Sequence, residues 1–334
     1  MSAAPPPSAT AAPRVAVVVP CLNEAAAVGK VVDDLRRALP GADVVVYDNG
    51  STDGTAEVAA RHGAQVRHEE RPGKGTVVRR AFADLEADVY VLIDGDDTYD
   101  ASVAGDLVRV LLTGGYDHVV GVRQAGTATA YRPGHATGNR ALNEVVSRVF
   151  GTPVADMLSG YRVVSRRFAK SFPAISRGFE IETELTVHAV SLRVPQREVP
   201  VGFRDRAEGS ESKLRTYRDG WRILRLILRL ARYRRPMAVH CLLGGLIGAV
   251  SLVLGIPLVV EFAETGLVPR FPTAILASGL AMIAALVVAV GIVLDAVHRA
   301  ADETMRLTYL RHPAPPRPPS VVPAPAAPQG RFRG

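Results

Sequence analysis

The stretch that decides the fold is Val15–Glu24, VAVVVPCLNE, in which an apolar run is followed at once by a polar loop. An unbroken run of Val and Ala that ends at Pro is typical of a strand buried on both faces of a sheet. The next segment, Glu24–Leu39, carries its apolar residues on one helical face: Val28, Val31, Val32 and Leu35. We therefore predict a strand, a polar loop at its carboxyl end, and a helix.

The same alternation continues along the chain. Strand-like runs at Val44–Tyr47, Gln65–Arg67, Val89–Ile93 and His118–Val122 alternate with helical patterns at Thr55–Arg61, Thr76–Leu85 and Val103–Leu112. Strands that alternate with helices through short links form a mostly parallel sheet between helical layers. The predicted fold class is α/β, with a Rossmann-like sheet, and ligands of such sheets bind beyond the carboxyl ends of the strands.

Polar residues gather at three of these strand ends: PCLNE (20–24), DNGSTDGT (48–55) and DGDD (94–97). Each segment has an ordinary explanation when it is taken alone. Asn23 could cap a helix, and the other two segments could be simple turns. Three ordinary turns that share one sheet edge are a much less economical explanation than one ligand site. We therefore expect this edge to be functional.

The pair Asp94 and Asp96 has the composition of a cation site, because two carboxylates flanking a small residue suit a hard divalent ion. Such an ion can bridge a diphosphate and neutralise a leaving group. The loop Arg71–Gly75, RPGKG, places Lys74 near a helix N-terminus, where it could face phosphate. The chain has neither the P-loop pattern nor GxGxxG, which argues against an ATPase or a dehydrogenase.

In this order and spacing, PCLNE, DNGSTDGT, RPGKG and IDGDDTYD resemble the family 2 glycosyltransferases, which have a GT-A fold. The later segments DMLSGYR (156–162), GFEIETEL (178–185) and GSESK (209–213) resemble the polyprenyl- or dolichyl-phosphate sugar synthases of that family. The resemblance covers about residues 14–235. It implies inverting transfer of a sugar from a UDP- or GDP-linked donor to a polyprenyl phosphate.

The resemblance also implies a role for each matching residue. Asp94 and Asp96 are the expected metal ligands, for Mg²⁺ or Mn²⁺, and Asp97 leaves open a third contact. Asn49 stands where many members have a second Asp. The expected donor-binding residues are Pro20, Asn23, Glu24, Asp48, Lys74 and Lys213.

On the acceptor side, Asp156 occupies a position proposed in the family as a base. Because a polyprenyl phosphate is already anionic, Asp156 could orient the acceptor instead. The expected acceptor-binding residues are Arg132, Arg162, Arg206 and Glu184. For Arg132 an ordinary solvated loop is an equal alternative, and the spacing between Arg206 and Lys213 is one residue longer than the common motif.

The net charge of +7 is confined to one segment. Residues 213–235 carry a local charge of +8, so the remainder is about neutral. Nucleic-acid binding is therefore not expected. On a helix, five arginines would form one stripe opposite apolar residues, which is typical of an interfacial amphipathic helix, although a packed surface helix remains an alternative. These arginines are Arg218, Arg222, Arg225, Arg229 and Arg232.

Two uncharged stretches follow, Ala238–Val260 and Pro272–Leu294, and each is long enough to span a bilayer as a helix. The alternative is a pair of core helices in a soluble protein. Basic residues lie before the first stretch and after the second, so the positive-inside rule places both termini in the cytoplasm. The expected location is a bacterial cytoplasmic membrane, as a multi-pass protein, and a homo-oligomer is compatible with this.

The expected organisation has five parts. A disordered N-terminus without signal-peptide features (1–13) precedes the catalytic domain (14–212) and the basic juxtamembrane helix (213–236). A transmembrane hairpin (237–298) and a Pro-rich cytoplasmic tail (299–334) follow. Two other functions stay open: a family 2 enzyme that acts on a glycan or glycolipid, and a catalytically silent membrane scaffold. Intact Asp94, Asp96, Asn23 and Lys213 argue against the scaffold.

Overall fold

The computed structural model describes residues 12–125, 155–178, 180–204 and 236–316. The chain divides into two compact units, which we describe separately. The first comprises Met1–Asp219 with Leu307–Gly334, and the second comprises Gly220–Arg306. Three predicted site residues, Arg132, Arg206 and Lys213, lie outside the described residues. So do the predicted amphipathic helix, most of the predicted N-terminal segment and the second half of the predicted C-terminal tail.

In the described part of the first unit, seven strands form one sheet in the order β3-β2-β1-β4-β6-β5-β7. The sheet is mostly parallel, as predicted, and only β6 runs antiparallel to its neighbours β4 and β5. The strands are β1 Val15–Cys21, β2 Asp43–Asp48, β3 Gln65–His68, β4 Val89–Leu92, β5 His118–Ala125, β6 Arg162–Ser165 and β7 Gln196–Phe203.

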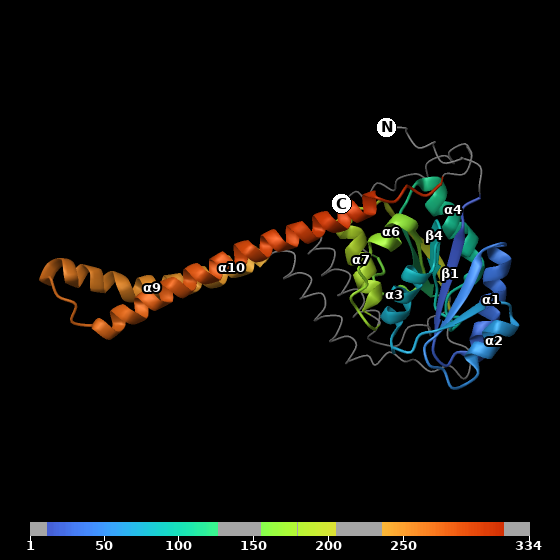
Figure 1. The fold of residues 1–334 in the computed structure, drawn as a ribbon, viewed down its shortest axis with the longest axis horizontal. Helices are drawn as coiled ribbons and strands as arrows, with labels where there is room; N and C mark the ends of the chain where they lie inside the picture. The colour runs from blue at the N-terminus through green and yellow to red at the C-terminus, as the bar shows by residue number, and fades with distance from the viewer. Residues whose placement is uncertain (1–11, 126–154, 179, 205–235, 317–334) are drawn as a thin grey trace, which may run out of the picture. The chain divides into compact units, whose positions relative to one another are not determined.

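Helices cover both faces of this sheet, as Figure 1 shows, with α1 and α4 on one side and α3, α6 and α7 on the other. The ends of α2 match the sequence prediction, and those of α1, α3 and α4 differ from it by one or two residues. The helices are α1 Ala25–Ala38, α2 Thr55–Arg61, α3 Lys74–Asp84, α4 Ala104–Gly114, α6 Arg166–Ser171 and α7 Ile181–Leu192, with a short 3₁₀ turn at Ala101–Val103.

The core between α1 and the sheet matches the predicted helical face. Val28, Val31, Val32 and Leu35 are all fully buried, and they pack in one cluster with β1 and α4. Burial of each such side chain contributes about 1.5–3 kcal/mol, so this face fixes α1 on the sheet. The first residues of α1 are thereby held at the carboxyl end of β1, where the polar loop begins.

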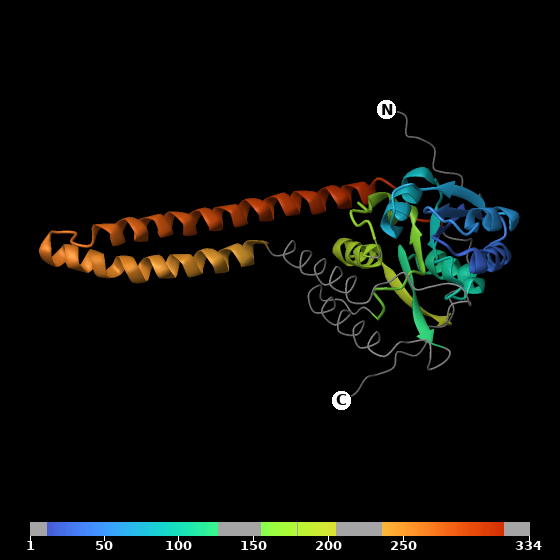
Figure 2. The ribbon, with the colours of Figure 1, turned by 90° about the horizontal axis from the view of Figure 1, so that it is seen from below.

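The second unit consists mainly of two long helices, α9 Pro236–Thr265 and most of α10 Phe271–Leu310, which lie side by side (Figure 2). They pack through small residues. A Cβ on Gly244 would lie 2.6 Å from Val288 Cγ2, and one on Gly291 would lie 2.5 Å from His240 Cβ. Ser251 Oγ also donates a 2.8 Å hydrogen bond to the Ala277 carbonyl. Close backbone approach of this kind is typical of helix pairs in membranes.

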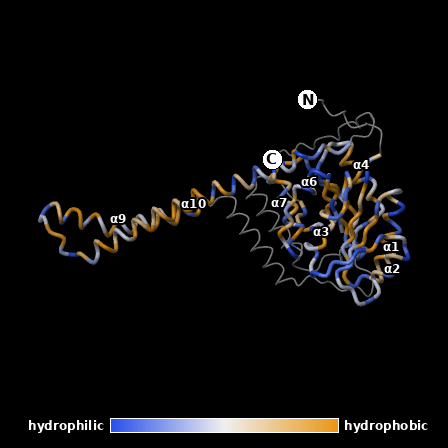
Figure 3. The backbone as a smooth tube through the Cα atoms, viewed as in Figure 1, coloured by the Kyte–Doolittle hydropathy of each residue, from blue (hydrophilic) through white to orange (hydrophobic). Residues whose placement is uncertain are grey.

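Both helices are long and apolar enough to cross a membrane, and they contain the two predicted spans. Their most apolar windows are only 17% and 11% buried. The core helices of a soluble protein would be mostly buried, so this exposure disfavours the soluble alternative. Figure 3 shows that hydrophobic residues predominate along most of both helices.

Candidate functional site

The loops after β1 and β2 are joined by hydrogen bonds at the carboxyl edge of the sheet. Cys21 and Asp48, the last residues of the two strands, are register partners. The Asn23 side chain accepts a 2.8 Å hydrogen bond from the Thr52 amide, and the Asn23 amide donates to Ser51 Oγ at 2.9 Å. Asn23 therefore joins the two loops and does not cap α1. Its backbone is left-handed, with φ of +52°.

The N-terminus of α1 is held instead by the β2 loop. The Glu24 amide donates to Thr55 Oγ1 at 2.9 Å, and the Ala25 amide donates to Asp53 Oδ2 at 3.0 Å. Glu24 itself is buried. The predicted donor residues Asn23 and Glu24 thus lie in a loop that hydrogen bonds make rigid.

Asp48 and Asn49 organise the β2 side of the edge. Asp48 is buried and accepts a 3.2 Å hydrogen bond from the Ser51 amide. Asn49 donates from Nδ2 to the carbonyls of Glu69 and Arg71, at 2.7 and 2.8 Å, and its Oδ1 accepts from the Gly73 amide at 2.7 Å. A carboxylate could not donate to two carbonyls, so the amide at position 49 is what holds the Arg71–Gly75 loop.

Lys74, the first residue of α3, lies between two carboxylates. Its ammonium pairs with Asp94 Oδ1 and lies 2.6 Å from Glu182 Oε1. Burial opposes the charge, but Asp94 and Glu182 outweigh it and raise the pKa of Lys74, so the side chain stays protonated. A small cavity beside it is lined by Pro20, Gly160 and Glu182 among others.

The two predicted metal ligands differ in environment. Asp94 has a side chain 28% exposed, beside Lys74. Asp96 is buried, and its Oδ1 accepts from the Thr98 amide at 3.2 Å and from Thr98 Oγ1 at 2.6 Å. A side chain at Gly95 would collide with Cys21 Sγ, so this packing admits only glycine between the two acids.

The composition of this edge fits a divalent ion only in part. Among the residues that the structure describes, no group of three or more His, Cys, Asp or Glu side chains is arranged to hold a metal ion. Asp94 and Asp96 provide oxygen donors of the right kind. Two protein carboxylates are the donor set of an ion that takes its other ligands from a substrate diphosphate and water.

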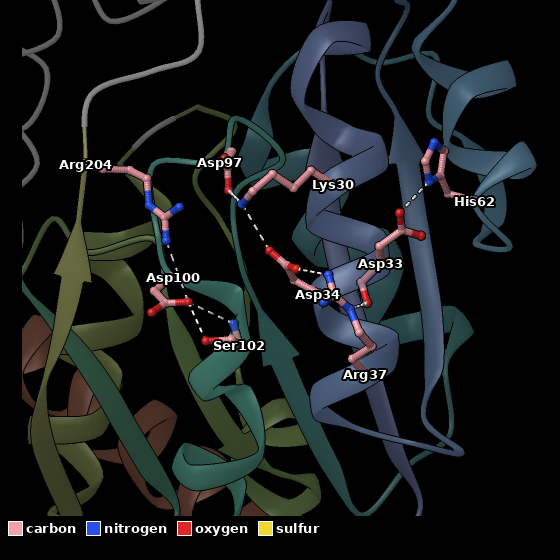
Figure 4. A network of polar contacts seen from close by, with 9 residues as sticks. All are labelled: Lys30, Asp33, Asp34, Arg37, His62, Asp97, Asp100, Ser102 and Arg204. Carbon is pink, nitrogen blue, oxygen red and sulfur yellow. Dashed lines mark hydrogen bonds and ion pairs between the residues drawn. The ribbon is translucent and has the colours of Figure 1, made fainter.

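Asp97 is engaged by Lys30 of α1 (Figure 4). Lys30 Nζ lies 2.7 Å from Asp97 Oδ1 and 3.0 Å from Asp34 Oδ2. The backbone of Asp97 is left-handed, with φ of +55°, so the chain reverses at this residue. On the other side of the loop, Asp100 accepts from the Ser102 amide at 3.1 Å and lies 3.7 Å from Arg204 (Figure 4).

Asp156, the predicted acceptor-side acid, is buried and bound by a residue that the sequence did not single out. Arg123 donates to it from Nε and Nη2, both at 2.7 Å. Arg123 lies near the carboxyl end of β5 and its guanidinium stands over the Phe203 ring at 5.5 Å. The position of this arginine at a strand end is the signal that could have identified it.

The structure places two other predicted acceptor residues in internal contacts. Both oxygens of Glu184 accept from backbone amides, those of Ile175 and Ser176, at 2.8 Å each. Arg162 is fully buried and binds carbonyls of its own loop. From α7, Glu182 and not Glu184 reaches Lys74.

Comparison with known proteins identifies the family of this chain. The profile of Glycosyl transferase family 2 matches residues 16–172. Glycosyltransferase AglJ of Haloferax volcanii is 36% identical over 75% of this chain and 81% of its own length. This chain belongs to glycosyltransferase family 2. A second relative of this family 2 enzyme, the dolichyl-phosphate hexose transferase of the same organism, is 30% identical over 66% of this chain and 95% of its own.

Solved structures identify the fold of this family 2 glycosyltransferase as GT-A. Glucosyl-3-phosphoglycerate synthase from Mycobacterium tuberculosis, in complex with Mn²⁺ and UDP-glucose, is similar with a TM-score of 0.55 and 27% identity. The match covers 66% of this chain and 79% of that one. The same synthase with Mg²⁺ and UDP matches with a TM-score of 0.54, also at 27% identity, over 65% and 79% of the two chains.

Proposed function

We propose that this family 2 glycosyltransferase transfers a sugar from a UDP- or GDP-sugar to a polyprenyl phosphate, with inversion, at the cytoplasmic leaflet of a bacterial membrane. The observation that carries the proposal is the presence in one chain of a carboxylate-lined sheet edge and an unburied apolar helical hairpin. The edge suits a nucleotide sugar, and the hairpin suits an acceptor that resides in lipid. The dolichyl-phosphate hexose transferase among the relatives supports the same acceptor class.

On the donor side, Asp94 and Asp96 would hold Mg²⁺ or Mn²⁺ together with the donor diphosphate. The ion supplies positive charge where the nucleoside diphosphate departs. Lys74 adds a second positive charge that is already fixed in place, because Asp94 and Glu182 hold it. Pro20, Asn23, Glu24 and Asp48 form the rigid wall for the nucleoside, and Lys213 would approach the phosphates.

On the acceptor side, the phosphate of the lipid supplies the nucleophilic oxygen. Arg123 is a fork-shaped cation suited to a phosphate, and Asp156 already occupies that fork. A carboxylate bound by both arms of a guanidinium is a poor proton acceptor. Asp156 therefore orients Arg123, in keeping with an acceptor that needs no strong base. Arg132 and Arg206 are further candidates for the acceptor phosphate.

The hairpin would anchor the enzyme at the bilayer. Helices α9 and α10 would span it, and basic residues on the chain before α9 and after the span of α10 would place both ends in the cytoplasm. The arginine stripe between residues 218 and 232 would lie on the anionic leaflet, and each arginine there adds about 1 kcal/mol. The catalytic edge would then meet the lipid phosphate where it emerges.

The test is a panel of radiolabelled nucleotide sugars, offered to the membrane-inserted enzyme with polyprenyl phosphate and either Mg²⁺ or Mn²⁺. The proposal expects label in the chloroform-extractable fraction for one donor, lost with EDTA and in Asp94→Asn. Transfer into a glycan or glycolipid but not the lipid phosphate would favour the second acceptor class. No transfer from any donor would favour a silent scaffold.

A further inference from the structure

Arg162 opens β6, between β4 and β5, and its side chain is fully buried. Its guanidinium donates to the Met157 carbonyl at 2.8 Å, to the Ser159 carbonyl at 2.9 Å, and to His118 Nε2 at 3.0 Å. None of these three hydrogen bonds goes to a carboxylate. Burial lowers the pKa of Arg162 to about 10, which still leaves it charged at neutral pH.

Burial of a guanidinium in this way is costly, because its charge leaves water and no carboxylate of the described residues contacts it directly. An apolar side chain of similar volume would often be as stable or more stable at such a position. The hydrogen bonds therefore indicate the role of Arg162: they fix the backbone conformation of the loop of residues 156–161.

His118 is built to receive this arginine. Arg162 can only donate, so Nε2 of His118 must accept, and the proton of the neutral ring resides on Nδ1. Nδ1 faces Gln196 Oε1 at 3.4 Å, and the ring stacks on Phe168 with centroids 5.0 Å apart. The His118 ring, which accepts the hydrogen bond from Arg162, is thus itself held by Gln196 and Phe168.

The loop of residues 156–161, which Arg162 holds, contacts both the proposed acceptor side and the proposed donor side of the site. Asp156 stands at its start, bound to Arg123. Gly160 stands near its end, so close to Asp94 that a side chain there would collide with that carboxylate and would lie 2.9 Å from Lys74 Nζ. The Gly160 amide donates to the hydroxyl of Tyr99 at 2.8 Å, which ties this loop to the segment that follows Asp94 and Asp96.

We propose that Arg162 is a positioning residue, which fixes the 156–161 loop and through it the relative placement of Asp94 and Asp156. This rests on the proposed function only in taking those two acids as site residues. Arg162 touches neither substrate in this account. Its effect on the reaction runs through Gly160 at one end of the loop and Asp156 at the other.

The test compares Arg162→Lys, Tyr99→Phe and the control Arg167→Lys in the full-length protein. A lysine keeps the charge but cannot serve three acceptors that lie in different directions. Arg167 is a control arginine outside the site; its side chain is 19% exposed, and its Nη2 lies 2.6 Å from Asp117 Oδ2. The readouts are kcat, the KM for each substrate, and amide hydrogen exchange by peptide.

Arg162→Lys is expected to lower kcat by roughly tenfold to a hundredfold, the range that a small misplacement of reacting groups produces. Exchange should accelerate in the peptide that covers residues 157–161, while β1 and β2 keep their protection. Tyr99→Phe should accelerate exchange in the same peptide, and the double variant should lose less activity than the product of the single losses, because both changes release one loop. Arg167→Lys should leave kcat and this peptide unchanged.

Unchanged exchange in the loop peptide of Arg162→Lys would overturn the proposal, as would a uniform loss of protection or independent effects of the two variants. If Arg162→Lys does not fold, Tyr99→Phe decides alone. Faster exchange confined to the 157–161 peptide supports the proposed positioning of this loop, and unchanged exchange refutes it. The exchange measurement needs no substrate. A failure to make a lipid product would therefore refute the proposed function and leave this test standing.

Discussion

Glu182 Oε1 lies 2.6 Å from the ammonium of Lys74, and the same ammonium also pairs with Asp94. Two helices, α7 and α3, are thereby joined at the residue that the sequence predicted to face phosphate. A donor that arrives with a divalent ion must fit beside this cation, since Lys74 shares Asp94 with the expected metal. The triad of Lys74, Asp94 and Glu182 therefore holds the ammonium of Lys74 in one position.

Lys74→Met should weaken donor binding and destabilise the fold. The change leaves the buried Glu182 and the partly exposed Asp94 without their shared cation. Loss of one partner from a fully buried ion pair costs about 3–5 kcal/mol. We expect a higher KM for the nucleotide sugar and a lower Tm in detergent. Lys30→Met is the matched control, because Lys30 is half exposed and its pairs with Asp97 and Asp34 are worth about 1 kcal/mol or less. Equal changes of donor KM and of Tm in the two variants would refute the importance of the Lys74–Asp94–Glu182 triad.

Asn49→Asp tests the amide that holds the Arg71–Gly75 loop. The carboxylate would face the carbonyls of Glu69 and Arg71 without a proton to donate, at a cost of about 1–3 kcal/mol. We expect the KM for the donor to rise several-fold while kcat changes little, as measured by initial rates. A donor KM equal to that of the wild type would show that the loop does not depend on position 49.

The buried histidine of α7 predicts acid sensitivity. Burial lowers the pKa of His188 to about 4, from an ordinary value of 6.5. The unfolded chain therefore takes up a proton below pH 6.5 that the folded chain refuses until about pH 4. Stability falls across this window as the pH decreases, by about 3 kcal/mol for this one group.

His188→Phe should remove that part of the acid loss. The ring already lies among Phe168 and Phe172, with centroids 5.0 and 5.3 Å away. Thermal melts of the detergent-solubilised protein between pH 7 and pH 4 should show a shallower decline of Tm in the variant. Parallel declines in the two proteins would exclude His188 as a cause of acid unfolding.

Gly291→Leu tests the packing of the hairpin. A Cβ at this position already meets His240, so a leucine should force α9 and α10 apart, at about 1–3 kcal/mol. Gly279→Leu on the same helix is the control, because a Cβ there meets nothing within 4 Å. We expect a lower Tm in detergent for the first variant alone. A Tm loss of similar size in both would contradict the packing described.

Much of this architecture could be predicted from the sequence because its signals are local. Buried strands such as Val15–Cys21 read as unbroken apolar runs, and the loops after them carry the polar residues that meet at one edge. The antiparallel β6 was not predicted, since strand order depends on pairing between distant segments. Arg162 is the first residue of β6, which lies between β4 and β5, and its side chain is buried there. The sequence could not show that this arginine binds carbonyls of the preceding loop.

The contact of Glu182 with Lys74 was not predicted from the sequence, which singled out Glu184 on this helix instead. Helix α7 is buried on almost every side, so its residues show no polar face from which a direction could be read. Only the packing of α7 against α3 shows that Glu182 meets Lys74 and that Glu184 binds the chain at Ile175. Arg123 was missed because it depends on Asp156, which lies 33 residues away.

The mass of the lipid product tests the central claim most directly. Full-length enzyme in polyprenyl-phosphate vesicles, supplied with its active nucleotide sugar and a divalent ion, should yield a polyprenyl monophosphate that carries one sugar, with release of the nucleoside diphosphate. Asp94→Asn should yield none, and Lys30→Met should yield nearly as much as the wild type. A lipid diphosphate product, or a sugar attached to a glycan with the polyprenyl phosphate unchanged, would contradict the account.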